Sequence, residues 1–284
     1  MAQQRSTDDD PQLRTEFRHQ VVSCRTSSNI DKSTTTPNAI WPASRKLGYE
    51  DREADDAFAS SDAVFAIADA AAQSYLSGRW ARRLVERCVS LSDIWLDVPI
   101  AVRETCAEWS EVLAAYVAQR EESGRPIKFY EEPKLALGSH ATLLVAQGAV
   151  SLEGGQTVWR VIGVGDSCIF RVSKEAVTAA VPITQSIDFD TAPALISSLK
   201  HAEKEPDYLR AHGTWVSGDR LFMLTDAVAQ WLLRGYENGD SPWSVLESLD
   251  EASFRNWVDE ERRLGRMRDD DVTVTRIVLE EASR

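Results

Sequence analysis

Apolar and polar residues alternate along this chain with a period that changes twice, from that of strands to that of helices and back. Two short apolar runs at residues 56–60 and 63–68 flank the turn Ser60-Ser61-Asp62, and this arrangement predicts a β-hairpin. Apolar residues then recur every three or four positions, which predicts two helices. The first helix is expected from about Leu76, and the second from about residue 102 to 121.

The pattern returns to strands in the second half of the chain. Three runs dense in β-branched residues predict strands at residues 141–152, 158–164 and 168–172. Residues 183–217 show no clear period and are expected to form an irregular insertion that covers one sheet edge. The remaining predicted elements are a strand at 221–224, helices at 227–233, from Pro242 and at 251–263, and a strand at 272–279. This order predicts an α+β fold in which helix pairs cover a strand-rich core.

The first 40 residues differ from the rest of the chain. They are polar, rich in Ser and Thr, and show little periodicity, so residues 1–40 are predicted to be a mostly disordered arm in which Phe17, Val21 and Val22 pack at most locally. The folded domain is expected over residues 41–284.

Composition and charge narrow the class of protein. Hydrophobic residues make up 43% of the 284 residues and charged residues 27%, the balance of a soluble globular protein. A net charge of −13 disfavours binding to nucleic acid or to an anionic membrane surface. No apolar run reaches the roughly 20 residues that span a bilayer. The four cysteines form no paired motif and the N-terminus has no hydrophobic signal core, so a reduced, cytoplasmic protein is expected.

Aspartates stand at the edges of apolar runs in four places that lie far apart along the chain. These residues are Asp56, Asp69, Asp226 and Asp270. Each aspartate alone is typical of a helix cap or a turn. Four that leave the ends of buried strands suggest a shared carboxylate cluster, and carboxylates without paired Cys or His ligands suit Mg²⁺ or Mn²⁺. The pattern therefore favours metal-assisted hydrolysis of a phosphate ester.

Six short segments between residues 45 and 280 occur in a particular order. They are Asp56-Ala57-Phe58, Phe65-Ala66-Ile67-Ala68-Asp69, Gly138-Ser139-His140-Ala141-Thr142, Gly163-Val164-Gly165-Asp166-Ser167, Leu221-Phe222-Met223-Leu224-Thr225-Asp226 and Asp270-Asp271-Val272-Thr273-Val274. Together they resemble the metal-dependent Ser/Thr protein phosphatases of the protein phosphatase 2C type. The resemblance implies a four-layer αββα sandwich with two Mn²⁺ or Mg²⁺ ions at one edge between the sheets, where metal-activated water attacks phosphorus.

The resemblance also assigns roles to individual carboxylates. It implies that Asp69 bridges both ions and that Asp226 and Asp270 are further ligands, which makes these three the candidate catalytic residues. Asp166 matches an acidic residue that some members use for a weak third ion, and it also suits the tight turn of a hairpin. The first acidic ligand is Asp56 if the pair Asp55-Asp56 is the matching one, and Glu50-Asp51 is the alternative pair.

Three departures from the family pattern bear on activity. Ala70, counted here with the metal positions, stands where the family usually has Gly, and it is expected to reduce metal occupancy if its φ is positive. Ala71 stands where several eukaryotic members carry a His proposed as general acid, so water would have to protonate the leaving group. The family's phosphate-binding Arg has no clear match, and Arg45 and Arg52 are the nearest candidates.

Two functions are therefore carried forward. The first is a protein Ser/Thr phosphatase that acts on a phosphorylated protein substrate, with a cognate Ser/Thr kinase as a further expected partner. The alternative is a catalytically weak or inactive phosphatase-like domain that binds a phosphoprotein or a kinase as a regulatory module. The altered segment Asp69-Ala70-Ala71 motivates the alternative.

Overall fold

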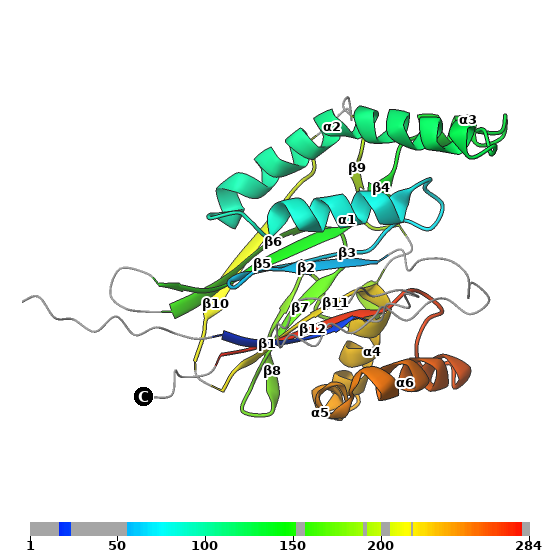
Figure 1. Ribbon diagram of the computed structural model, residues 1–284. Helices are drawn as coiled ribbons and strands as arrows, with labels where there is room; N and C mark the ends of the chain where they lie inside the picture. The colour runs from blue at the N-terminus through cyan, green and yellow to red at the C-terminus, as the bar shows by residue number, and fades with distance from the viewer. Residues whose placement is uncertain are drawn as a thin grey trace, which may run out of the picture.

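The computed structural model describes residues 17–23, 56–151, 157–189, 192–199, 205–216 and 218–279. Within them, two five-stranded antiparallel sheets form the middle of the molecule (Figure 1). The first sheet has the order β1 (Phe17–Ser23), β12 (Thr273–Leu279), β11 (Arg220–Leu224), β7 (Cys168–Ser173), β8 (Ala176–Val181). The second has the order β10 (Leu209–Thr214), β6 (Thr157–Val164), β5 (Leu143–Ser151), β3 (Val64–Ala68), β2 (Ala57–Ser60). A small ladder joins β4 (His140–Ala141) and β9 (Ile196–Ser197).

Strand β3 illustrates why the central strands read as continuous apolar runs. All five of its residues are buried, because both faces of its sheet are covered. Phe65 and Ile67 point to the cluster between the two sheets, where they meet residues of β7, β11 and β12. The alternate residues Val64, Ala66 and Ala68 point to the cluster under the helices. A strand buried in this way needs apolar residues at every position rather than at every second one.

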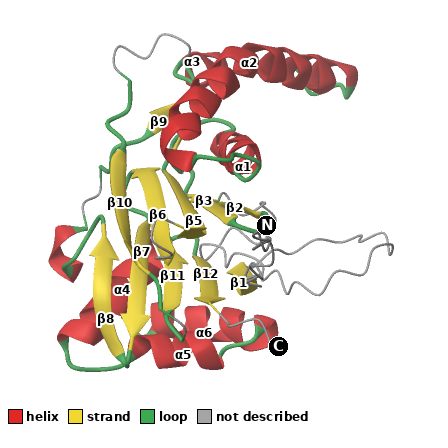
Figure 2. Cartoon of the chain, turned by 90° about the vertical axis from the view of Figure 1, so that its left-hand side faces the viewer, coloured by secondary structure: helices red, strands yellow, loops and turns green. Residues whose placement is uncertain are grey.

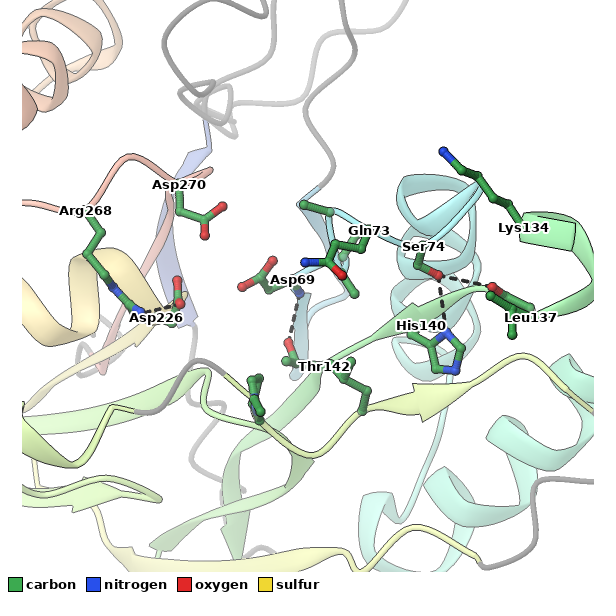
Figure 3. A pocket seen from close by; sticks show the side chains of 17 residues that line it. Asp69, Gln73, Ser74, Lys134, Leu137, His140, Thr142, Asp226, Arg268 and Asp270 are labelled. Atoms are coloured by element: carbon green, nitrogen blue, oxygen red, sulfur yellow. Dashed lines mark hydrogen bonds and ion pairs between the residues drawn. The ribbon is translucent and has the colours of Figure 1, made fainter. Parts of the chain in front are cut away.

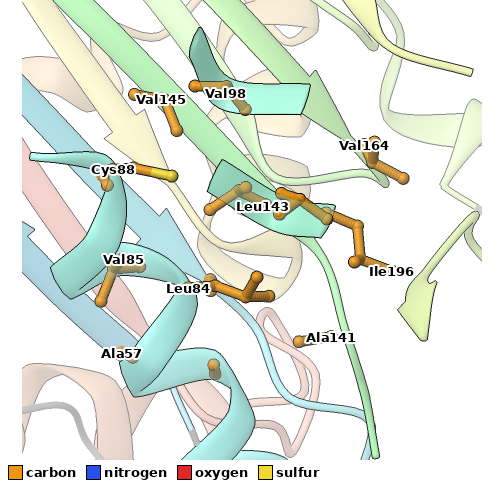
Figure 4. Packing of buried hydrophobic residues seen from close by; sticks show 14 of the residues in the cluster. Ala57, Leu84, Val85, Cys88, Val98, Ala141, Leu143, Val145, Val164 and Ile196 are labelled. Atoms are coloured by element: carbon orange, nitrogen blue, oxygen red, sulfur yellow. The ribbon is translucent and has the colours of Figure 1, made fainter. Parts of the chain in front are cut away.

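Helices cover the outer face of each sheet (Figures 1 and 2). Helices α1 (Ser77–Cys88) and α2 (Ile94–Glu122) pack on the second sheet, where Leu84 and Val85 meet Leu143 and Val145 of β5 (Figure 4). Helices α4 (Asp226–Glu237), α5 (Pro242–Ser248) and α6 (Glu251–Arg263) pack on the first sheet. The short helices α3 (Glu132–Ala136) and η1 (Ser186–Asp188) lie in connections. The layer order is helix, sheet, sheet, helix, which confirms the predicted α+β sandwich.

The structure corrects the sequence predictions at several elements. Residues 17–23, expected in a disordered arm, form β1 and pair along their whole length with β12. The predicted domain start near residue 41 and the rest of the arm lie outside the described residues. Helix α2 begins at Ile94, well before the predicted 102, since the Asp93 side chain accepts hydrogen bonds from the Trp95 and Leu96 amides.

Two further strands of the main sheets, β8 and β10, were missed, and neither is well buried along its length. Strand β8 has no fully buried residue, and β10, within the segment expected to be irregular, is polar and largely exposed. Each is the edge of its sheet. An edge strand that buries little surface needs no strong apolar pattern, so sequence periodicity does not reveal it. Among the described helices, none has the length and apolar character to cross a membrane.

Candidate functional site

Five aspartates from separate parts of the chain meet at one end of the sandwich, between the sheets. Asp69 follows β3, Asp226 opens α4 directly after β11, and Asp270 precedes β12. Asp56 stands just before β2, and Asp166 lies in the turn between β6 and β7. They are close enough that Asp226 and Asp270 raise the pKa of each of the other three. The structure thus brings together all five carboxylates singled out in the sequence.

Three of these carboxylates line a cleft of about 770 Å³. In Figure 3 the side chains of Asp69, Asp226 and Asp270 face a common space. Asp56 and Asp166 lie outside this lining and are buried behind it. The cleft is therefore lined by three carboxylates, and two further carboxylates of the cluster are buried outside this lining.

The electrostatics of the cluster are unfavourable for ionised carboxylates. Burial is the main cause that raises the pKa of Asp56 well above its usual value, followed by the charge of Asp271. Asp69 is only half-buried because it opens on the cleft, yet loss of water around it and then the charge of Asp56 raise its pKa strongly as well. Burial and then Asp226 raise the pKa of Asp166 to about 7. Such a cluster has to take up protons or bind cations.

The oxygen atoms at the back of the cluster fit a hard divalent cation. Oδ2 of Asp56 accepts a hydrogen bond from the Thr273 hydroxyl at 2.9 Å, while Oδ1 is buried and no described residue donates to it. Both carboxylate oxygens of Asp166 are buried, and no other described residue donates to them either. Across the described chain, no three His, Cys, Asp or Glu side chains already surround a single ion position. The donor chemistry suits Mg²⁺ or Mn²⁺, and binding would draw the carboxylates closer together.

Asp69 is fixed through its backbone by Thr142. The Asp69 amide donates to Thr142 Oγ1 at 2.9 Å, and the Thr142 amide donates to the Asp69 carbonyl at 2.8 Å. The hydroxyls of Thr142 and Ser167 share a further hydrogen bond of 3.0 Å. These contacts fix the backbone of Asp69 and do not involve its carboxylate, which faces the cleft (Figure 3).

Gly165 makes this support possible, and its substitution gives a first prediction. Its φ is +106°, and a Cβ there would lie 2.5 Å from Thr142 Cγ2. We expect Gly165→Ala to lower the free energy of unfolding by about 3 kcal/mol, from backbone strain plus the clash with Thr142. Gly239 has a φ of +86° with no atom near its Cβ position, so Gly239→Ala is the matched control and should cost about 1 kcal/mol. Urea unfolding measures both, and equal losses would contradict the role of the clash.

Ala70 does not carry the strain that the sequence raised as a concern. Its φ is not positive, because Leu76, Lys174 and Glu175 are the non-glycine residues with positive φ among those described. Ala70 forms a bridge with Ala141, in which the neighbouring residues make the hydrogen bonds. The Ala70 carbonyl thus lies outside this ladder and at the cleft. The alanine is compatible with the site, so the condition for reduced metal occupancy is not met.

A basic residue that the sequence interpretation missed lies inside the cluster. Arg268 lines the cleft, and its Nη2 donates to Asp226 Oδ2 at 2.7 Å. The sequence does carry a signal for it, because two basic residues, Arg266 and Arg268, stand directly before Asp269-Asp270-Asp271. The positions Arg45, Arg52, Glu50-Asp51 and Asp55 lie outside the described residues.

The other end of the cleft carries no carboxylate and combines polar with apolar side chains. Lys134, Ser74 and His140 line it, and the Ser74 hydroxyl lies 3.3 Å from His140 Nδ1. Burial lowers the pKa of His140, which favours the neutral imidazole. Figure 3 shows His140 beside Leu137 and away from the aspartates. Ala71 lines the cleft near Asp69 and has no proton to give.

Comparisons with known proteins agree on the fold. No protein-family model matches the sequence, and no curated protein matches it. The Mycobacterium tuberculosis serine/threonine phosphatase PstP/Ppp matches with 16% identity and a TM-score of 0.52, over 84% of this chain and 96% of that one. The PPM Ser-Thr phosphatase MsPP from Mycobacterium smegmatis, in complex with cacodylate, matches with 15% identity and a TM-score of 0.52, over 87% and 100%. The S. agalactiae serine/threonine phosphatase matches with 11% identity and a TM-score of 0.55, over 84% and 98%. The chain has the fold of these PPM-type phosphatases.

Proposed function

We propose that this chain, which shares the fold of the PPM Ser/Thr phosphatases, is a metal-dependent protein Ser/Thr phosphatase. The observation that carries the proposal is the meeting of five aspartates at one end of the sandwich, where their raised pKa values call for cations. The order of the six sequence segments that carry these aspartates supports it. So does the similarity to MsPP, which was solved in complex with an oxyanion.

Each residue of the cluster has a role in the proposal. Asp69, Asp226 and Asp270 would hold two Mn²⁺ or Mg²⁺ ions, with Asp56 and the Ala70 carbonyl as further ligands and Asp166 beside a weaker third position. The bound ions supply Lewis-acid activation of the phosphoryl group and of the attacking water. Asp69 lies close enough to the other four aspartates for each of them to raise its pKa, which suits a carboxylate shared by both ions. Because Ala71 has no proton to give, the leaving oxygen takes its proton from water.

The substrate class follows from the shape of the cleft. It is open and extends from the aspartates to Lys134 and His140, so a phosphorylated side chain could enter while the rest of the peptide lies along the end without carboxylates. A phosphorylated protein suits such an open groove better than a small metabolite, which needs an enclosed pocket. A cognate kinase as a partner stays a prediction.

The binding-module alternative has one specific observation in its favour. Arg268 already neutralises Asp226, and in the described part of the chain no three ligands surround one ion position. A domain that keeps this ion pair would bind metal weakly and could recognise a phosphoprotein without hydrolysing it. The phosphatase and the binding module are therefore distinguished by whether the protein hydrolyses a phosphorylated peptide.

Hydrolysis of a phosphothreonine peptide by the purified protein tests the proposal. We expect phosphate release with added Mn²⁺ and a loss of at least about a hundredfold after chelation, because the activated water depends on the ions. The Asp62→Asn variant, changed at an exposed turn residue at the far end of the hairpin, is the control and should match the wild type. Peptide binding without release at any Mn²⁺ concentration would reject the phosphatase and favour the binding module.

A further inference from the structure

We propose that Arg268 is a built-in cation that competes with a divalent ion for Asp226 and thereby lowers the affinity of the site for metal. The inference rests on the proposed metal site, but it concerns a residue that the site's sequence pattern does not include. It also makes a prediction opposite to that for the aspartates: removal of the Arg268 side chain should improve metal binding.

The first support is the contact between Arg268 and Asp226. The guanidinium donates to Asp226 Oδ2 at 2.7 Å, in a cleft where Asp226 is buried and Arg268 is one-third exposed. Charge-assisted hydrogen bonds of this kind are about twice as strong as neutral ones. The guanidinium occupies one lone-pair direction of Oδ2 and draws electron density from this oxygen, so Arg268 and a metal ion compete for it.

The second support is the position of the charge within the cluster. Arg268 also lowers the pKa of Asp166, so one guanidinium serves as counter-ion to two of the five carboxylates. Even where a metal ion coordinated the other oxygen of Asp226, the fixed positive charge would repel it at short range. Competition for the oxygen and repulsion therefore act in the same direction.

The third support is that this arginine alone, among those near it, turns to the cleft. Arg266 pairs with Glu261, and Arg262 is buried and lies near Asp259 and Asp269. Arg268 instead lies over the ring of Phe189, with its guanidinium carbon 5.8 Å from the ring centroid, and this contact supports its side chain. The arrangement holds Arg268 beside Asp226 even though its loop carries three successive aspartates.

A Mn²⁺ titration followed by electron paramagnetic resonance of the free ion tests the inference. We expect Arg268→Gln to bind Mn²⁺ at least about tenfold more tightly than the wild type, the effect of losing one charge-assisted bond. The matched control is Arg266→Gln, which removes an arginine two residues away that pairs outside the cleft, and its affinity should equal that of the wild type. Arg268→Lys keeps the charge and should bind Mn²⁺ nearly as weakly as the wild type.

Thermal unfolding gives a second, independent readout. Without metal, Arg268→Gln should melt below the wild type because it leaves the carboxylates without their counter-ion, and with Mn²⁺ its melting temperature should rise by more than that of the wild type. Unchanged or weaker Mn²⁺ binding by a folded Arg268→Gln, or equal tightening in Arg268→Lys, would overturn the inference and make Arg268 a residue that orients Asp226. If wild type and all variants bind no Mn²⁺, the proposed metal site itself fails.

Discussion

Asp69→Asn is expected to reduce Mn²⁺-dependent hydrolysis of a phosphothreonine peptide by roughly 10³-fold while the fold is retained. The loss follows from the place of Asp69 among the other four aspartates of the cluster, where the neutral amide of asparagine lacks the negative charge that a carboxylate ligand supplies to a cation. The fold should survive because Asp69 is held to Thr142 through its backbone amide and carbonyl, which asparagine keeps.

The stability of this variant provides the internal check. The pKa of Asp69 is raised by loss of water and by four neighbouring carboxylates, so its charge destabilises the metal-free protein. Asp69→Asn should therefore melt at a higher temperature than the wild type without metal and gain less from Mn²⁺. Asp62→Asn, at the exposed turn of the same hairpin, should change neither rate nor melting temperature. Full activity in Asp69→Asn would remove this residue from the mechanism.

The layers of the fold could be predicted from sequence because buried strands and amphipathic helices leave strong patterns. Strand β3, buried on both faces, reads as an unbroken apolar run, and α6 begins at a capping box around Asp250. The edge strands β8 and β10 were missed, since β10 is polar and largely exposed and β8 is a short run with no fully buried residue. Strand β1 was missed because its pairing with β12 depends on backbone contacts between residues at least 250 positions apart, as with Ser23 and Thr273.

The carboxylates of the site were accessible from sequence for the opposite reason. An aspartate at the end of a buried strand is conspicuous, and Asp69 and Asp226 each end such a run. What surrounds them was not accessible. The bond from Thr273 to Asp56 joins residues that are 217 positions apart, and the ion pair of Arg268 with Asp226 joins residues 42 positions apart. Periodicity says nothing about such contacts.

The φ of Ala70 is a further example. The sequence could only state a condition, because alanine in place of glycine matters where the backbone is left-handed and hardly elsewhere. The structure gives an ordinary backbone at Ala70 and positive φ at Gly165 instead. The glycine on which the support of Asp69 depends is therefore in the β6–β7 turn.

The metal-free protein should lose stability as pH rises, and Mn²⁺ should reverse this trend. The pKa of Asp166 is about 7 in the folded protein against 3.8 as the reference, so between these values the folded state keeps a proton that the unfolded chain has released. Stability then falls with rising pH and levels off above the folded pKa. Asp56 and Asp69, whose pKa values are also raised, act in the same direction. We expect the melting temperature to fall by about 5 °C or more from about pH 5 to about pH 8.

Other groups do not produce this trend. The ion-paired Glu131 has a pKa lowered from 4.5 to about 2, so its contribution rises with pH and is nearly complete at the acidic end of this range. His140 acts in the opposite direction, since its lowered pKa makes the protein more stable as pH rises. The Asp166→Asn variant keeps the shape of the side chain and removes the titrating group, so it isolates the contribution of Asp166. At high pH its melting temperature without metal should be higher than that of the wild type, because the destabilising charge is absent.

Saturating Mn²⁺ should reverse the fall of the melting temperature with rising pH. The ions bind the ionised carboxylates and compete with protons, so the rise in melting temperature on adding Mn²⁺ should grow with pH, and most steeply near pH 7. Differential scanning fluorimetry at several pH values, with and without Mn²⁺, measures both slopes. A metal-free melting temperature that stays flat or rises, together with no effect of Asp166→Asn, would mean that these aspartates do not act as a buried cluster of like charges. In that case neither the proposed metal site nor the counter-ion role of Arg268 would have an electrostatic basis.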